Sequence, residues 1–138
     1  MKPNVLMAAS ATIIGLLGFA HLVFTFWGPQ LLPRDKSAKE AMEQVAPVIT
    51  KQTTIWRMWI GFNASHAMGT LFFGLSYSYL ALAHGDILFG SIFLQVLGFA
   101  MLAGLVVLAK LYWFIAPLAG AGLSLILYVT SIVLAWAA

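Results

Sequence analysis

The chain has 138 residues, of which 62% are hydrophobic and only 8% are charged. About a quarter of the residues of a soluble domain are charged, so this composition excludes an ordinary soluble domain and predicts one membrane domain over residues 1–138. Cysteine is absent, which excludes disulfides, thiolate metal sites and cysteine nucleophiles. The net charge of +3 comes from few groups. We interpret it as a topology signal, with no nucleic acid among the expected partners.

Four apolar stretches reach the length of about 20 residues that crosses the hydrocarbon layer of a bilayer. They cover residues 4–27, 54–83, 87–109 and 112–136. The first exceeds the core of a signal peptide, which has about 7–15 residues, and is predicted to be a retained helix. Short connections at 84–86 and around Lys110 favour antiparallel neighbours. The predicted fold is all-α, an antiparallel four-helix transmembrane bundle.

The connection at 28–53 differs from the others because it holds three of the chain's four carboxylates. Asp35 is placed to cap a short helix, and Pro47 is placed to end it. Ala38, Met42 and Val45 share one face of that helix. The pattern predicts an amphipathic helix at the membrane surface. The alternative is an ordinary solvated helix folded over the end of the bundle.

Lysine and arginine are distributed unequally on the two sides of the predicted bundle. Six lie on the side of the 28–53 loop, namely Arg34, Lys36, Lys39, Lys51, Arg57 and Lys110, whereas Lys2 alone lies on the other. Cytoplasmic loops of membrane proteins carry the excess of positive charge. We therefore expect a multi-pass protein of the cell membrane, with a cytoplasmic 28–53 loop and both termini on the outer side.

The second predicted span begins with the stretch IWRMWIGFNASHAMG, at residues 55–69. Polar and aromatic residues recur there at helical spacing and form one stripe: Trp56, Trp59, Asn63, His66, Thr70, Phe73 and Tyr77. A second set, Gly61, Ser65 and Gly69, repeats every four residues. Small residues at this spacing allow another helix to approach closely in lipid. The pattern predicts a packing face beside a polar face.

The first predicted span carries a matching surface. Its small residues, which include Gly15 and Gly18, form a stripe that continues towards His21. At about 1.5 Å per residue, the membrane depths of His21 and His66 differ by about 7–8 Å. We therefore expect His21, Arg57, Asn63 and His66 to converge in the cytoplasmic half of the bundle.

Ionisable side chains inside a membrane are functional candidates because burying them is costly. We expect a pocket for a lipid-like or other amphiphilic ligand between the first two spans. Arg57 would meet an anionic head group, Asn63, Ser65 and His66 would form hydrogen bonds further in, and His21 would close the far wall. The structural alternative is that the histidines serve packing only and that Arg57 reaches towards lipid phosphates.

Two other functions fit the same residues. The chain would suit a non-catalytic accessory subunit of a larger membrane complex, or a homo-oligomer, with the small-residue stripes as the interface. Alternatively, His21 and His66 would hold a haem between facing helices. The expected offset in depth argues against the haem.

The spans contain no carboxylate, which argues against a proton- or sodium-coupled transporter. No phosphate-binding loop and no HExxH motif occur. Ser65 adjoins His66, but neighbours on a helix point about 100° apart, which argues against a Ser–His catalytic pair. No residue is therefore assigned a catalytic role, and no metal site other than the haem alternative is expected.

The chain resembles an uncharacterised family of small bacterial four-helix membrane proteins. The resemblance rests on GFAHLVFTF, LLPRD and TTIWRMWIGFNASHAMGTLFFGLSYSYLAL, which include the pattern W-x-G-F-N-x-S-H. It covers about the first 83 residues. It implies the four-helix architecture and draws attention to the same polar residues, but it implies no chemistry.

Overall fold

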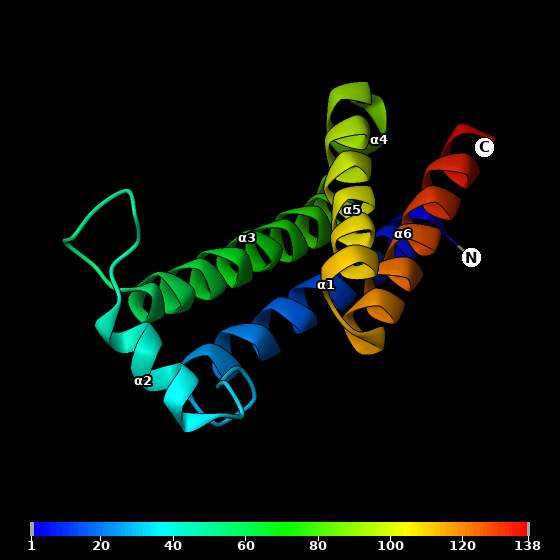
Figure 1. The fold of residues 1–138 in the computed structure, drawn as a ribbon. Coiled ribbons are helices and arrows are strands. Elements are labelled where there is room, and N and C mark those ends of the chain that lie inside the picture. The colour runs from blue at the N-terminus through cyan, green and yellow to red at the C-terminus, as the bar shows by residue number, and fades with distance from the viewer. Residues whose placement is uncertain (1, 138) are drawn as a thin grey trace. The chain divides into compact units, whose positions relative to one another are not determined.

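The computed structural model describes residues 2–137, and these residues form six α-helices (Figure 1). In chain order they are α1 (Pro3–Phe26), α2 (Lys36–Gln44), α3 (Ile55–Ala83), α4 (Gly85–Gly90), α5 (Ile92–Tyr112) and α6 (Ile115–Trp136). The described residues contain no β-strand. The all-α class predicted from the sequence is confirmed.

Three helices within residues 2–137 are long and apolar enough to cross a membrane, namely α1, α5 and α6. This is the composition of an integral membrane protein. With 29 residues, α3 is longer than any of them. It is less apolar because polar and hydroxyl-bearing side chains are interspersed along it. The fourth span and the antiparallel bundle of four helices remain predictions.

Contacts between residues divide the chain into two compact units, each of which is described by itself. Unit 1 comprises the residues up to Leu17 and those from Thr70 onward, and unit 2 comprises Gly18–Gly69. Both α1 and α3 therefore contribute residues to both units.

Buried serines join α1 and α6 in unit 1. The hydroxyl of Ser10 donates to the carbonyl oxygen of Ser124 at 2.7 Å, and the hydroxyl of Ser124 donates to the carbonyl oxygen of Ser10 at 2.9 Å. Both serines are fully buried. The beginning of α1 is joined to α6 by a similar bond, since the hydroxyl of Ser131 donates to the carbonyl oxygen of Pro3 at 2.7 Å. Such bonds hold helices together in lipid, where burial of apolar surface gives them no driving force.

Glycines bring α1 and α3 into close contact at one point of unit 1. A Cβ atom added to Gly74 would lie only 2.6 Å from the Cα of Gly15. The predicted packing residues Gly61 and Gly69 behave differently, because both are exposed and an added Cβ would meet no atom within 4 Å. The predicted residue Gly18 is buried. Within the described chain the close helix contact thus uses Gly15 and Gly74, and the expected packing face of α3 lies open.

The predicted span at 87–109 is interrupted, which corrects the expected boundaries. Ser91 adopts an extended conformation, and its hydroxyl accepts a hydrogen bond from the backbone N–H of Leu94, so it caps α5 and separates it from the short α4. Buried Gln95 secures the break, since its Nε2 donates to the carbonyl oxygen of Phe89 at 2.8 Å. Lys110, expected in a connection, lies instead in the last turn of α5.

The core of unit 1 combines apolar side chains with satisfied polar groups. The hydroxyl of Tyr128 donates to the carbonyl oxygen of Gln95 at 2.8 Å, and that of Tyr77 donates to the carbonyl oxygen of Leu94 at 2.7 Å. In addition, the indole N–H of Trp136 donates to Oε1 of Gln95 at 3.0 Å. Among the described residues no buried side-chain polar atom lacks a hydrogen-bond partner. This is a requirement for polar groups placed among lipid-embedded helices.

The segment at 28–53 contains α2, as expected, although α2 ends at Gln44, three residues before Pro47. Asp35 caps this helix, because its carboxylate accepts a hydrogen bond from the backbone N–H of Ser37 at 2.9 Å. The ammonium of Lys39 lies 5.2 Å from the ring centroid of Trp56 in α3. The backbone N–H of Ile55 also donates to the carbonyl oxygen of Val45 at 2.9 Å. These contacts hold α2 against the beginning of α3.

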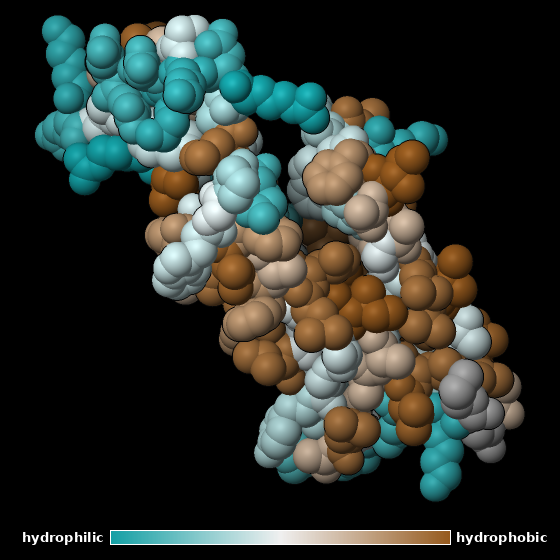
Figure 2. All heavy atoms as spheres, turned by 90° about the horizontal axis from the view of Figure 1, so that it is seen from below, coloured by the Kyte–Doolittle hydropathy of each residue, from teal (hydrophilic) through white to brown (hydrophobic). Residues whose placement is uncertain are grey.

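Large apolar side chains cover much of the surface. Phe62 is 73% exposed, Phe72 is 75% exposed and Ile115 is 81% exposed. Figure 2 shows such apolar residues as brown spheres on the face that it presents. Contiguous apolar surface of this kind is unfavourable in water and suits contact with lipid.

Candidate functional site

His21 and Asn63 form the centre of the candidate site in unit 2. Nε2 of His21 lies 2.9 Å from Oδ1 of Asn63, and Nδ2 of Asn63 donates to the carbonyl oxygen of Trp59 at 2.8 Å. Since the amide oxygen of Asn63 can only accept, the proton of this bond lies on Nε2 of His21. The hydroxyl of Thr25 donates to the backbone carbonyl of His21 at 2.7 Å. In the neutral ring, this arrangement leaves Nδ1 of His21 as a hydrogen-bond acceptor.

His66 lies beside this pair. The rings of His21 and His66 are 5.2 Å apart between centroids and meet edge to face, with an interplanar angle of 79°. Both side chains are partly buried. One turn of α3 separates Asn63 from His66, so both point towards the same part of α1. Three of the expected site residues are therefore brought together.

The haem alternative does not fit this geometry. A haem held by two histidines lies between their rings, but the rings of His21 and His66 contact each other directly. Nε2 of His21 is also engaged by Asn63. A macrocycle would have to separate the two helices and break that bond. Among the described residues there is also no group of three or more His, Cys, Asp or Glu side chains placed to hold a metal ion.

The other two expected residues lie away from the cluster. Arg57 is exposed in the first turn of α3, and six residues of helix place it about 9 Å along the axis and about 120° around it from Asn63. Ser65 is also exposed, and its hydroxyl donates to the carbonyl oxygen of Phe62 at 3.0 Å within its own helix. Because Ser65 follows Asn63 by two residues, it lies on nearly the opposite side of the helix. Of the five expected site residues, three therefore form a cluster, namely His21, Asn63 and His66. The other two, Arg57 and Ser65, lie apart from it.

Unit 2 also contains an open hollow of about 370 Å³, which no pattern in the sequence predicts. It is lined by Gln30, Leu31, Leu32, Pro33, Met42 and Trp59. The indole N–H of Trp59 donates to the carbonyl oxygen of Leu31 at 3.2 Å, which fixes the ring as a wall. Trp59 was assigned to the polar stripe from its spacing. The loop residues 30–33, which line the hollow together with Trp59, follow no periodic pattern, so the sequence does not predict their position.

The charged residues nearest in sequence to the lining of the hollow lie in α2 and just before it. Lys39 and Glu43 form an ion pair of 2.8 Å, and no other ion pair occurs among the described residues. Two hydrogen bonds from Ser37 lower the pKa of the Asp35 carboxyl group. The bond from the Ser37 hydroxyl has the larger effect, and the bond from its backbone N–H has the smaller. Arg34 adjoins the lining residue Pro33 and is exposed, with no carboxylate within 4.0 Å.

Comparisons with models of protein families, with curated proteins and with solved structures found no match to this chain. The family resemblance carried by W-x-G-F-N-x-S-H therefore stays a prediction, and the function is argued from the site alone.

Proposed function

We propose that the chain is an integral membrane protein with four spans, in which α3 crosses the bilayer together with α1, α5 and α6. The length of α3 supports this, because 29 residues of helix extend over about 43 Å, more than the roughly 30 Å of hydrocarbon. Its polar side chains Asn63 and Ser65 have hydrogen-bond partners within the chain. The charge distribution supports a cytoplasmic 28–53 loop and outer termini.

Cysteine labelling tests this topology, because the natural chain has no cysteine. With four spans, a cysteine at Lys36→Cys is labelled by a membrane-impermeant maleimide only in permeabilised cells, and one at Ala137→Cys is labelled in intact cells. If α3 does not cross, the remaining two spans after the loop return the C-terminus to the side of the loop. Labelling of both variants from the same side would therefore overturn the four-span arrangement.

We further propose that unit 2 binds an amphiphilic ligand with an anionic head group. The observation that supports this most directly is the position of Trp59, whose ring lines the apolar hollow and whose carbonyl oxygen accepts a hydrogen bond from Asn63. The apolar wall at Trp59 and the polar cluster at Asn63 thus lie one helical turn apart on α3. Ligand pockets typically combine mostly apolar linings with a few placed polar groups.

The head group is assigned from the charged residues that adjoin the lining of the hollow in sequence. Lys39, the cation that lies one turn before Met42, is paired with Glu43, whereas Arg34 beside Pro33 is not paired with a carboxylate. A guanidinium group binds carboxylate and phosphate through two parallel hydrogen bonds. The ligand that fits both features is a fatty-acid-like molecule. Its acyl chain lies against Leu31, Met42 and Trp59, and its acidic group lies at the Arg34 guanidinium.

Fluorescence quenching tests the proposal in the purified full-length chain, with a brominated fatty acid as the probe. Bromine atoms quench nearby indoles, so we expect saturable quenching that is lost in Trp59→Phe and retained in Trp136→Phe. Met42→Trp fills the hollow and should weaken binding at least fivefold. Met68→Trp is the matched control, because Met68 is 64% exposed and lies outside the hollow.

Two outcomes would contradict the binding site, and a third would contradict only the head group. Quenching that rises linearly with probe concentration, equally in Trp59→Phe and Trp136→Phe, indicates partition of the probe into the general apolar surface. Equal affinity of Met42→Trp and Met68→Trp indicates that the hollow is not the binding site. Unchanged affinity in Arg34→Gln rejects the assigned head group but leaves the apolar site standing.

A second candidate function is that of a subunit in a larger membrane complex. It is supported by the exposed face with Gly61, Ser65 and Gly69, which has no partner helix in the described chain. Small residues at this spacing suit close approach by another transmembrane helix. Native sizing after mild extraction distinguishes the cases, since co-purifying chains or a dimer support this role and a monomer in detergent opposes it.

A further inference from the structure

Unit 1 contains a second open hollow, of about 480 Å³, at the ends of several helices. It is lined by Pro3, Asn4, Leu82, Ala83, Gly85, Asp86, Phe89 and Ala135. These residues belong to the beginning of α1, the end of α3, the short helix α4 and the end of α6. In a membrane protein such helix ends lie at the interface between hydrocarbon and water. All of these residues belong to unit 1, so the hollow shares no residue with the proposed ligand site of unit 2.

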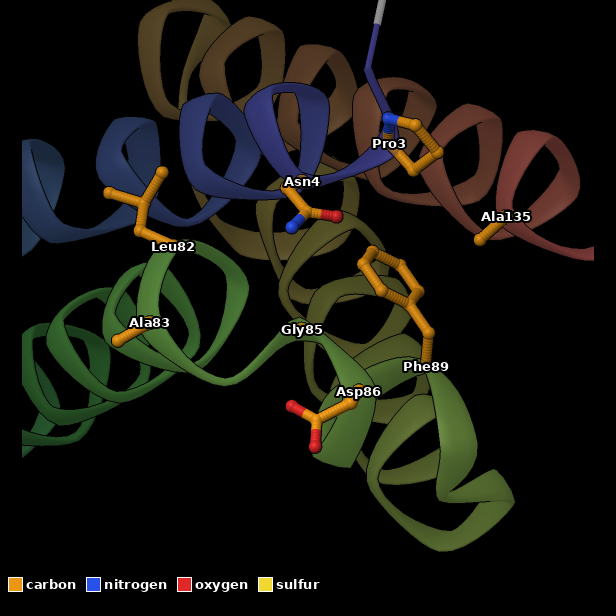
Figure 3. A pocket seen from close by; sticks show the side chains of 8 residues that line it. All are labelled: Pro3, Asn4, Leu82, Ala83, Gly85, Asp86, Phe89 and Ala135. Atoms are coloured by element: carbon orange, nitrogen blue, oxygen red, sulfur yellow. The ribbon is translucent and has the colours of Figure 1, made fainter. Parts of the chain in front are cut away.

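The walls of this hollow are mostly apolar, and its backbone is closely packed. A Cβ atom on Gly85 would lie 2.7 Å from Nδ2 of Asn4, so the asparagine side chain packs directly on the glycine backbone. Figure 3 shows Asn4 and Phe89 directed towards the same space from α1 and α4. The Asp86 carboxylate is directed away from the Phe89 ring. The ring and the carboxylate therefore offer two separate contacts, one apolar and one charged.

Asp86 is the only carboxylate side chain of unit 1. It is exposed, and none of the described lysine, arginine or histidine side chains lies within 4.0 Å of it. The neighbouring His84 is engaged elsewhere, since its Nε2 lies 3.2 Å from the hydroxyl of Tyr79. The lysines of unit 1 are Lys2, which precedes the lining residue Pro3, and Lys110 in the last turn of α5. The hollow thus carries one carboxylate that no described ion pair neutralises.

We propose that this hollow binds a membrane lipid whose head group carries an ammonium ion. The ammonium lies at the Asp86 carboxylate, and the first part of the lipid chain lies against Phe89, Pro3 and Ala135. Charge complementarity determines the class of head group, because Asp86 is the one charged residue in the lining of the hollow, and its carboxylate favours a cation and opposes a free anion. The apolar walls favour an amphiphile over a free amine, since the small cation alone would leave them exposed to water.

Amide NMR of the full-length chain in a neutral detergent tests this proposal, with dodecylammonium as the probe. We expect saturable shifts of the Gly85, Asp86 and Phe89 amides. Ethylammonium, the head group alone, should give no saturable shift, and dodecyl sulfate, with the same chain and the opposite charge, should bind more weakly. Asp86→Asn should weaken dodecylammonium binding about two- to fivefold, which is the contribution of an exposed ion pair. Asp86→Lys should reverse the preference in favour of dodecyl sulfate.

The matched control is Asp35→Asn, which removes an exposed carboxylate of unit 2 and should leave these shifts unchanged. Equal binding of dodecylammonium and dodecyl sulfate by the natural chain would overturn the proposal without any variant. Saturable binding of ethylammonium would show that the hollow binds a free amine and would overturn the proposal of a lipid. Because the readout is confined to residues of unit 1, it succeeds or fails independently of the Trp59 quenching experiment.

Discussion

Gly15 and Gly74 meet so closely that the contact tolerates a side chain on only one of them. A Cβ on Gly74 would lie 2.6 Å from the Cα and 2.8 Å from the backbone nitrogen of Gly15, whereas a Cβ on Gly15 would lie 3.5 Å from the Cα of Gly74. The first approach is shorter than real contacts, and the second is ordinary van der Waals contact. The two glycines of one contact are therefore not equivalent.

We expect Gly74→Ala to destabilise the protein by about 1–3 kcal/mol, the usual cost of overpacking a tight core. Backbone atoms cannot move aside as a flexible side chain can, so α1 and α3 must separate at this point. Gly15→Ala should cost less. The measurement is the free energy of unfolding in mixed micelles.

Gly69→Ala is the matched control for that experiment. Gly69 lies in the same helix, and a Cβ there meets no atom within 4 Å. Alanine is a better helix former than glycine by about 0.5–1 kcal/mol, so this variant should be neutral or more stable. Destabilisation by Gly69→Ala together with an unchanged stability of Gly74→Ala would show that the predicted stripe and not the observed contact packs the helices.

The reciprocal bonds of Ser10 and Ser124 give a second prediction. Each single change to alanine removes one buried hydroxyl donor and should cost about 0.5–1.5 kcal/mol. Because the two hydroxyls also lie 2.9 Å apart, the double variant should cost less than the sum of the single variants. Thr130→Ala serves as the control, since Thr130 is exposed and bonds only within its own helix. Strict additivity would argue against the paired arrangement.

The bond between His21 and Asn63 predicts one tautomer of an imidazole. Because Oδ1 of Asn63 accepts, the neutral ring of His21 should carry its proton on Nε2. Nitrogen-15 NMR of the imidazole distinguishes the two nitrogens directly. Asn63→Ala should broaden or shift the Nε2 signal, while Ser65→Ala, on the opposite side of α3, should leave it unchanged. A proton on Nδ1 in the natural chain would contradict the assignment.

The capping bond of Asp35 predicts a local response to acid. Hydrogen bonds from Ser37 lower the pKa of this carboxyl group below its ordinary value of 3.8. A depressed carboxyl pKa stabilises the folded segment fully above the ordinary value, and the stabilisation is lost as the pH falls through the lower, folded value. We therefore expect α2 to keep its helical Cα chemical shifts at neutral pH and to fray below about pH 4.

Variants at the same position separate the cap from other effects of acid. Asn is also a good N-cap but does not titrate, so Asp35→Asn should keep α2 helical at both pH values. In Asp35→Ala, α2 should fray at both pH values, because alanine cannot cap the helix. Fraying of Asp35→Asn in acid would assign the pH response to another group of the segment, such as the pair of Lys39 and Glu43.

The lengths of the apolar runs were sufficient to predict the three longest helices from the sequence. Residues 4–27 correspond to α1, 54–83 to α3 and 112–136 to α6, because a helix in lipid must satisfy its own backbone hydrogen bonds. The cap at Asp35 was also predictable, since a short acceptor before a helix is a local signal. The break at Ser91 was missed because apolar residues surround it, and composition alone does not separate α4 from α5.

Only the tertiary structure decided which faces of these helices meet. Gly61, Ser65, Gly69 and Gly74 are all small residues of α3, and spacing groups the first three on one stripe, yet the contact with α1 in unit 1 is made by Gly74. Periodicity describes the surface of one helix and carries no information about where another helix lies. The same holds for His21 and His66, whose rings meet at 5.2 Å although the sequence predicted an offset in depth of about 7–8 Å. Counting residues gives a position along each helix but not the level at which two helices lie side by side. The hollow beside Trp59 depends on loop residues 30–33, whose position follows from packing and from no repeating pattern in the sequence.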